Sequence, residues 1–498
     1  MKIAIVGGGL SGASALKSLL NHPNLKKEDT IDIYEPRDIL GVGLPYGPDD
    51  ESLMLNVSPD YLSVDDNDPL DFSKWLKEKY KEPFNDEGLV SRPKFGYYLA
   101  ERFEPYFSHR QVTHIKASVQ DIDVLDAETK EKTHYKQSGQ HVYRLKTSEE
   151  TIEGTYDAVF LAVGHPEYAD YYHLKGTEGY ISNPYPANKK LVNIGNDERI
   201  GVIGSGATGI DLMRFFTRNY DLKHPLTFYV QDQGFYFADI PYERERLRFS
   251  FSKEWITREK EKGSGLIPLE NILSTFTKDI QAFGVDVSKI YNRYKAGNLT
   301  AIKKAVDSKD QELALIQAYT SKLIPYLPSL YNSLSGQDKQ TYLTKYYSKL
   351  LFFKSRVPYE TSVWLLDLIK QGKVQIKYGL KEIQSSEDGG FILQASESDR
   401  VGRLINAAGF EMRLEKNGKG STLIYNLFRK NIIMPHQNGR FVLIDWPHAH
   451  VLNQNYGAMQ SLFFFGLLVG GTQHGNNDAP LTYQLASRSA KWFMDQRK

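Results

Sequence analysis

The chain has 498 residues, a net charge of +1 and no cysteine. Its 62 basic and 61 acidic residues nearly balance, so the charge gives no reason to expect a nucleic-acid partner. The missing cysteines exclude a redox dithiol, an iron–sulfur cluster and a thiolate metal site, so electron transfer would need bound organic cofactors.

The chain opens on an apolar run, a glycine turn and a helical pattern. Residues 2–12 read KIAIVGGGLSG, with glycines at Gly7, Gly9 and Gly12. The first glycine permits a tight turn, the second lets the backbone approach a pyrophosphate, and the third lets helix and strand pack closely. The helix begins near Leu10 and Ser11, where free N–H groups favour phosphate. Glu35, which ends the run TIDIYE, is expected to accept a hydrogen bond from a ribose 2′-OH.

The following segments alternate between loops, helices and strands. A glycine and proline loop, GVGLPYG, is followed by helical spacing over residues 71–80 and over most of residues 91–107. Residues 111–156 alternate apolar and polar in the manner of antiparallel strands. The apolar strand YDAVFLAVGHP then ends on small residues that include Gly164, as is needed where backbone lies against a cofactor or a crossing chain.

A second copy of the opening pattern begins at residue 199. RIGVIGSGATG contains Gly204, Ser205, Gly206, Thr208 and Gly209, and Asp232 follows the next strand at the register of Glu35. The repetition predicts two dinucleotide-binding units.

The nucleotide of the second unit is left open between NADH and NADPH, with a preference for NADH. The carboxylate of Asp232 would repel a 2′-phosphate. Against this, Arg244, Arg246 and Arg248 follow closely, and arginine is the usual ligand of a 2′-phosphate.

The predicted fold class is α/β, with two Rossmann-like, doubly wound, three-layer domains, the second inserted in the first, plus a mainly helical insertion. The predicted ranges are 1–190 and 400–498 for the first dinucleotide-binding domain, 195–250 and 350–400 for the second, and 250–350 for the helical insertion. The late apolar run SLFFFGLLVGG, residues 461–471, is too short to span a bilayer and is predicted to be a buried helix. The first residues lack the features of a signal peptide, so a cytoplasmic protein is expected.

Several short pieces carry a family resemblance: GVGLPYG, Leu55-Asn56-Val57, Arg92-Pro93, Gly164-His165-Pro166 and the two fingerprints. Together they resemble the flavoproteins with two dinucleotide-binding domains, in particular the FAD/NAD(P)-binding group that includes FAD-dependent urate hydroxylases and aspartate N-monooxygenases. The resemblance implies FAD in the first unit and NAD(P)H in the second. It also implies a monooxygenase that hydroxylates a small polar molecule through a C4a-hydroperoxyflavin.

The same resemblance suggests further FAD contacts. Pro45 and Asn56 would lie along the isoalloxazine side, although Asn56 also suits a turn-stabilising bond. Asp445 would lie near the ribityl chain, or else be a turn residue at a strand end. Gly466 would begin a helix whose N-terminus faces the flavin pyrimidine carbonyl.

The catalytic residues are not predicted, but four candidates carry polar or aromatic groups near predicted strand ends, where ligands gather in open α/β sheets. They are Tyr98, His165, Arg356 and His448. Each also suits a structural hydrogen bond, and His448 with His450 is not expected to hold a metal. Two other functions stay open: a flavin reductase without oxygen insertion and a non-catalytic dinucleotide-binding protein. The oligomeric state is not predicted.

Overall fold

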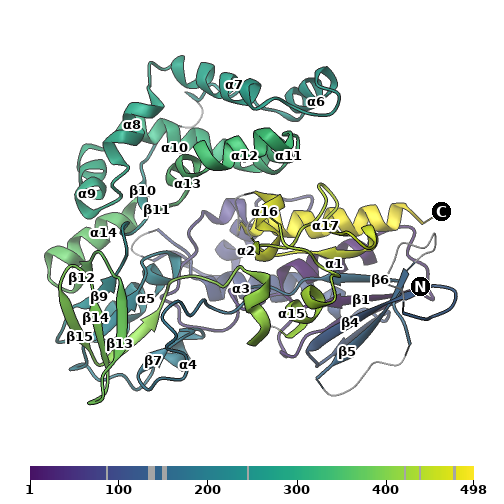
Figure 1. Cartoon of the computed structure of the whole chain (residues 1–498), viewed down its shortest axis with the longest axis horizontal. Helices are drawn as coiled ribbons and strands as arrows, with labels where there is room; N and C mark the ends of the chain where they lie inside the picture. Colours follow the sequence, from purple (N-terminus) through teal and green to yellow (C-terminus); the bar gives the residue numbers. More distant parts are fainter. Residues whose placement is uncertain are drawn as a thin grey trace.

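The chain folds into two α/β units and a layer of helices that stands above both in the view of Figure 1. The computed structural model describes residues 1–85, 88–132, 141–148, 154–243, 246–419, 422–436, 439–474 and 478–497. Both larger sheets are built mainly of parallel strands, which confirms the predicted fold class. Among the helices of these ranges, none combines the length and apolarity that a bilayer crossing requires.

The first unit is built on a six-stranded sheet in the order β17-β18-β6-β1-β2-β3. Neighbouring strands run parallel except β17 and β18, which are antiparallel. Val6, at the end of β1, lies opposite Tyr34 and Leu161, so these carboxyl ends meet at one edge. The strands are β1 (Lys2–Val6), β2 (Thr30–Tyr34), β3 (Val112–Ile115), β6 (Ala158–Leu161), β17 (His450–Asn453) and β18 (Gly457–Phe464).

Helices cover this first sheet, and two of them that pack together come from opposite ends of the chain. Helix α1 packs along α17, and Ser18 and Ser487 share a hydrogen bond of 2.6 Å between them. An antiparallel pair, β4 (Val119–Asp126) and β5 (His141–Thr147), lies beside the sheet in Figure 1. The helices of this unit are α1 (Leu10–Leu20), α2 (Asp71–Lys79), α3 (Arg92–Phe107), α15 (Thr422–Arg429), α16 (Gly470–Gln473) and α17 (Ala479–Asp495).

The second unit is built on a five-stranded parallel sheet in the order β12-β9-β8-β16-β7. It is inserted in the chain between β6 and β17 of the first sheet. A three-stranded antiparallel sheet, β13 (Glu382–Ser385), β14 (Phe391–Gln394) and β15 (Ser398–Val401), accompanies it. Its other elements are β7 (Tyr180–Ile181), α4 (Ala187–Lys190), β8 (Ile200–Ile203), α5 (Ala207–Asn219), β9 (Leu226–Tyr229), α14 (Tyr359–Lys370), β12 (Val374–Lys377) and β16 (Arg403–Asn406).

The helical insertion leaves and re-enters the second unit at one place. Its two ends are β10 (Phe237–Asp239) and β11 (Arg356–Pro358), which pair in parallel. Polar side chains cap several of its helices; for example, Asn298 accepts a hydrogen bond from the N–H of Ala301 at 3.0 Å. The helices are α6 (Lys253–Lys262), α7 (Leu269–Gln281), α8 (Val287–Tyr294), α9 (Leu299–Ser308), α10 (Gln311–Leu323), α11 (Leu327–Asn332), α12 (Gly336–Lys345) and α13 (Tyr347–Lys354).

One hydrophobic core joins the insertion to the second unit. Ile302 and Ile316 of the insertion belong to the same buried cluster as Val202 and Phe228 of the second sheet. The first sheet has a separate core with α1 and α17. The insertion is therefore a continuation of the second unit's core rather than an isolated appendage.

The predicted buried helix over residues 461–471 is wrong. Residues 457–464 form strand β18, Gly466 has a φ of +98°, and only Leu467–Val469 and Gly470–Gln473 are helical. A short apolar run suits a buried strand as well as a buried helix, and here residues 462–464 pair with β6.

The predicted domain boundaries also need correction. Strand β16, residues 403–406, pairs with β8 in the second sheet, although the prediction assigned residues from 400 onward to the FAD-binding domain. Strand β7, residues 180–181, likewise pairs with β16, although it falls inside the predicted range 1–190. Both segments complete the second sheet, in which β16 lies between β8 and β7, and β7 forms the edge.

Candidate functional site

The first glycine loop joins β1 to α1, and its packing leaves no room for a side chain at Gly7 or Gly12. Gly7 has a φ of +104°, and a Cβ there would lie 2.1 Å from the carbonyl oxygen of Ala162. A Cβ on Gly12 would lie 2.0 Å from the carbonyl oxygen of Gly7. Gly9 precedes α1 without a side-chain cap, so the first N–H groups of the helix stay free for an anion.

Glu35 lies directly after β2 and is held by two groups. Its Oε2 accepts a hydrogen bond from the N–H of Gly8 at 3.0 Å, and Arg37 donates to both carboxylate oxygens at 2.8 and 2.9 Å. Burial alone would raise the pKa of Glu35, but the contacts with Arg37 and Gly8 lower it below its usual value. The carboxylate is thus ionised and fixed beside the glycine loop.

A cleft of about 1870 Å³ runs from the first glycine loop to the second unit and the helical insertion. Arg356 and Ser321 line it on the insertion side, and Ala207 and Asp211 line it from α5, the helix that follows the second glycine loop. Of the residues predicted to contact FAD, most line this cleft: Gly7, Gly9, Leu10, Ser11, Glu35, Pro45, Asn56, Gly164 and Gly466. Gly12 packs behind them against Gly7.

Asp445 lies outside this cleft. Its two carboxylate oxygens accept hydrogen bonds from the backbone N–H and the ring Nδ1 of His450, at 2.7 and 2.8 Å. The ribityl contact predicted for Asp445 therefore has no support in the structure, and the alternative of a turn residue describes it better. Gly466 does begin a helical turn, but the turn is the short segment Leu467–Val469.

The second glycine loop repeats the geometry of the first. Gly204 has a φ of +90°, and a Cβ on Gly209 would lie 3.2 Å from the carbonyl oxygen of Gly204. Gly206 precedes α5 without a side-chain cap, and the hydroxyl of Thr208 shares a hydrogen bond of 3.0 Å with Tyr168. Ser205 is buried beneath the loop. This loop also leaves free N–H groups at a helix start, which suits a second pyrophosphate.

Asp232 does not reach the cleft. It is exposed, three residues beyond the end of β9. Tyr236, four residues further on, does line the cleft. Its hydroxyl lies beside the second glycine loop, 3.4 Å from where a Cβ on Gly206 would be. The sequence analysis missed Tyr236, since no spacing rule marks an aromatic residue at this position.

Two of the three arginines that could bind a 2′-phosphate lie next to acidic side chains. Arg246 forms an ion pair with Glu243 at 2.6 Å, and Arg248 lies 3.4 Å from Asp279. Arg244 lies outside the described residues.

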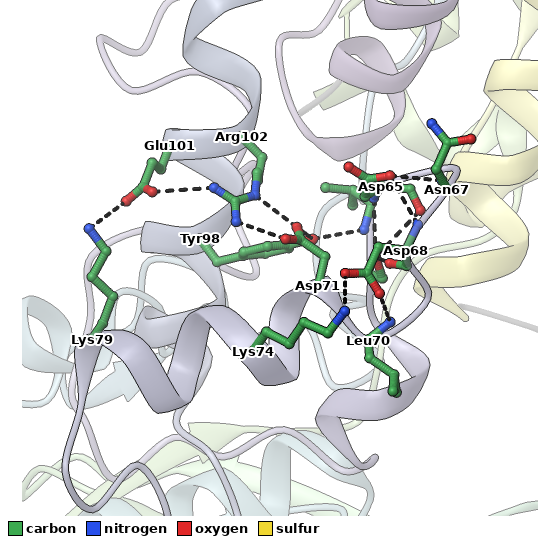
Figure 2. Close-up of polar contacts among 12 residues, drawn as sticks. Asp65, Asn67, Asp68, Leu70, Asp71, Lys74, Lys79, Tyr98, Glu101 and Arg102 are labelled. Atoms are coloured by element: carbon green, nitrogen blue, oxygen red, sulfur yellow. Dashed lines mark hydrogen bonds and ion pairs between the residues drawn. The ribbon is translucent and has the colours of Figure 1, made fainter.

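Tyr98 supports the cleft wall from behind instead of lining it. Its hydroxyl donates to Asp71 at 2.8 Å and accepts from the N–H of Val64 at 3.0 Å, and Arg102 holds Asp71 through two bonds of 2.8 Å (Figure 2). The Arg102 hydrogen bonds lower the pKa of Asp71, and burial raises the pKa of Tyr98. The network fixes the acidic loop around Asp65, which does line the cleft.

Of the other three catalytic candidates, two line the cleft and one lies on a different pocket. His165 lines the cleft and stacks on Phe410, with ring centroids 4.8 Å apart. Arg356 also lines it, and its guanidinium donates to Asp239 and Ser321 at 2.6 Å each. His448 lies instead on a smaller pocket of about 430 Å³ beside α17.

Two further residues in the cleft escaped the sequence analysis. Lys354 ends α13, and burial lowers its pKa to about 8. Asp478 caps α17 through the N–H of Leu481 at 3.2 Å, and burial raises its pKa. Groups with such shifted pKa values are common at functional sites. The sequence around Lys354, FFKSR, contains no motif that would have marked Lys354 as a site residue.

Comparison with known proteins agrees with this geometry. Residues 4–166 match the sequence model of a family described as FAD-NAD(P)-binding. The uncharacterized protein YdhS of Escherichia coli (strain K12) is 25% identical over 231 residues, which are 42% of this chain. The match spans 38% of the length of that relative.

Three solved structures share the fold over nearly the whole chain. L-lysine 6-monooxygenase from Pseudomonas syringae is 12% identical with a TM-score of 0.59, covering 100% of this chain and 99% of its own. Ornithine N-hydroxylase from Kutzneria sp. 744 is 12% identical with a TM-score of 0.57, covering 99% of both. Bacillithiol disulfide reductase from Staphylococcus aureus is 10% identical with a TM-score of 0.51, covering 100% and 99%. Residues 4–166 are therefore similar to an FAD-NAD(P)-binding domain, and the chain shares the fold of these three solved structures over nearly its whole length.

Proposed function

We propose that the protein is an FAD- and NAD(P)H-dependent monooxygenase that hydroxylates a small polar molecule. The observation that carries the proposal is the single cleft, which is lined by the first glycine loop, by the start of α5 and by the helical insertion. Two dinucleotides bound at the two loops would thus meet in one cavity that also has room for a substrate.

The similar structures support this choice. The solved structure of the Kutzneria ornithine N-hydroxylase contains reduced FAD, NADP+ and L-ornithine, and the Pseudomonas syringae protein is a lysine monooxygenase. The staphylococcal protein shares the fold but is a disulfide reductase. Because the present chain has no cysteine, it has no dithiol of its own for such exchange.

The chain's own residues have definite tasks under this proposal. The N–H groups at the start of α1 and the backbone of Gly9 hold the FAD pyrophosphate, and Glu35 accepts from the ribose. The loop with Pro45 and Asn56 covers the ring side of the cleft. Bound flavin supplies the chemistry, because it accepts a hydride and activates dioxygen. The protein contributes orientation and exclusion of water.

The second loop holds the pyridine nucleotide, and the preference for NADH is part of the proposal. The carboxylate of Asp232 follows β9 at the ribose position of the motif. Asp232 is exposed and does not line the cleft, so the preference for NADH rests on the negative charge of its carboxylate, which would repel a 2′-phosphate. NADH should therefore reduce the protein with the higher kcat/KM.

The test is the oxygen balance of the purified flavoprotein. Reduced protein is mixed with air in the presence of amines, amino acids and purines, and NAD(P)H consumed is compared with hydroxylated product and H2O2. The proposal expects one substrate that converts NAD(P)H consumption from H2O2 release into product formation. Release of H2O2 alone with every substrate, together with rapid reduction of a quinone, would show a reductase instead.

A further inference from the structure

A charged cluster joins the two dinucleotide-binding units at the wall of the cleft. Arg92 is the first residue of α3 in the first unit, Asp211 lies in α5 of the second, and Tyr185 lies between β7 and α4 of the second. Arg92 Nη2 forms an ion pair with Asp211 Oδ2, and the Tyr185 hydroxyl donates to the same oxygen. The Arg92 guanidinium also lies over the Tyr185 ring, 5.6 Å from its centroid. We call these three residues the junction cluster.

The junction cluster is withdrawn from solvent. The Arg92 side chain is 18% exposed and that of Asp211 is 8% exposed. Burial would lower the pKa of Arg92, but the charge of Asp211 outweighs it and raises the pKa well above its usual value. Burial and Asp211 also raise the pKa of Tyr185. A buried ion pair contributes little net stability, but it tolerates few geometries and so restricts how its two elements can lie.

The position of the junction cluster relates it to both glycine loops. Asp211 lies on the first turns of α5, which begins directly after Gly206. Arg92 and Asp211 both line the cleft that also contains Gly9. A second contact joins the two units near the junction cluster. The side chain of Asp49 in the first unit accepts hydrogen bonds from the backbone N–H groups of residues 187 and 188 in the second, at 2.9 and 3.0 Å.

We propose that the junction cluster holds the second glycine loop at the angle and distance at which hydride transfer between the two cofactors takes place. Arg92, Asp211 and Tyr185 are positioning residues, and this role rests on the proposed function. The reaction they serve moves a hydride, two electrons and one proton, from the reduced nicotinamide ring to the flavin. The nicotinamide is oxidised, the flavin is reduced, and no other reagent is needed. A displacement of about 1 Å in such a geometry costs on the order of 100-fold in rate.

The test compares two carboxylates with similar surroundings. Asp399 accepts from the Tyr229 hydroxyl at 2.5 Å and from Lys377 at 2.7 Å, but it lies within the second unit and away from the cleft. The variants D211N and D399N are prepared as FAD holoenzymes, and the rate of anaerobic flavin reduction by NADH or NADPH is measured by stopped flow. Reduction by dithionite, which needs no nucleotide, is measured on the same samples. R92K, which retains the charge, is the second junction variant.

The expected result is a reduction rate about 100-fold lower in D211N and intermediate in R92K, with the dithionite rate and the FAD content unchanged. The dissociation constant for the oxidised nucleotide should stay within about threefold, since the glycine loop itself is intact. D399N should keep the wild-type reduction rate even if its melting temperature falls.

Wild-type reduction rates in both D211N and R92K would overturn the proposal, as would an equal loss in D399N. If neither nucleotide reduces the wild-type flavin, the proposed function fails. Small-angle scattering of the holoenzymes then still tests the junction cluster, because D211N should have a larger radius of gyration than wild type and D399N should not. Identical scattering curves for all three would overturn it.

Discussion

At Gly12 the packing leaves no space for a side chain. A Cβ at this position would lie 2.0 Å from a backbone oxygen, and neither α1 nor the loop can move without disturbing the pyrophosphate site. The glycine pattern that suggested a dinucleotide site is thus also a requirement of packing. The same residue serves the fold and the ligand.

We expect G12A to purify without bound FAD and to lose about 3 kcal/mol or more of stability, because the new methyl group overlaps backbone. Flavin absorbance per chain and denaturant unfolding measure the two effects. G336A is the matched control, since a Cβ on Gly336 meets nothing within 4 Å at the start of α12. Full FAD content in G12A would contradict this account of the loop.

Tyr98 illustrates a polar residue whose role is structural support. Its hydroxyl links Asp71 (Figure 2) to the backbone N–H of Val64, next to Ser63 and Asp65, which line the cleft. Removing it leaves a buried N–H without an acceptor.

Y98F should therefore lower the stability by about 1–3 kcal/mol and weaken substrate binding more than it slows flavin reduction. Thermal unfolding and substrate KM report these effects. Tyr97 on the same helix is 49% exposed, so Y97F should change neither. A large drop in the flavin reduction rate of Y98F with unchanged stability would instead support the catalytic role predicted from the sequence.

At the scale of elements, His474, the residue directly after α16, packs against the helical insertion. His474 is 3% exposed, stacks on Tyr331 of α11 with ring centroids 4.0 Å apart, and shares a hydrogen bond of 2.7 Å with Tyr342 of α12. Burial, with the nearby charges of Lys354 and His436, lowers its pKa to about 3. Folding thus requires a neutral imidazole at this contact.

This requirement predicts acid sensitivity. An unfolded histidine has a pKa of about 6.5, so the folded value is the lower one, and the unfolded state binds the extra proton. The contribution is complete above about pH 6.5 and is lost as pH falls toward 3, by about 1.4 kcal/mol per pH unit. Urea unfolding between these pH values should show a shallower dependence in H474N than in wild type.

H173N provides the control for this experiment, because His173 is exposed and also has a positive φ, 56° against 44° for His474. Asparagine tolerates this backbone region in both places. An H474N curve with the wild-type slope would contradict the assignment of the proton to His474.

The sequence predicted those elements well that carry a ligand-binding motif or a regular spacing of apolar residues. Both glycine loops, helix 71–79 and the helices of the insertion lie where expected. The run at 461–464 was mistaken because apolar runs of that length fit strands and helices alike. The carboxylate of Asp445 is bonded to His450 and does not line the cleft, and a sequence pattern does not indicate which way a turn directs such a side chain. Lys354, Asp478 and Arg92–Asp211 come together only through tertiary folding, and no local spacing marks them.

At the scale of the whole molecule, the shared core makes the insertion and the second unit one folding unit. Ile316 and Ile302 belong to the same cluster as Val202 and Phe228. The insertion supplies part of the cleft wall, for example Ser321 and Lys354; Figure 1 shows its helices as a layer above the two units. Its position over the cleft is therefore set by packing and not by a linker.

I316A should lower the stability of the insertion and the second unit together, by about 2–5 kcal/mol, because it opens a cavity in the common core. Hydrogen exchange should show the loss in α10 and in β8–β9 alike. Ile39, which is 46% exposed, provides the control I39A. Faster exchange confined to the insertion would contradict a shared core.

The central claim is that two glycine loops hold two different cofactors in one cleft. The most direct measurement is an anaerobic titration of the purified protein with NADH and NADPH, with flavin absorbance as the readout. The account predicts one FAD per chain that is bleached by one equivalent of nucleotide, with NADH the faster reductant. A protein that takes up no FAD, or whose flavin neither nucleotide reduces, would contradict it.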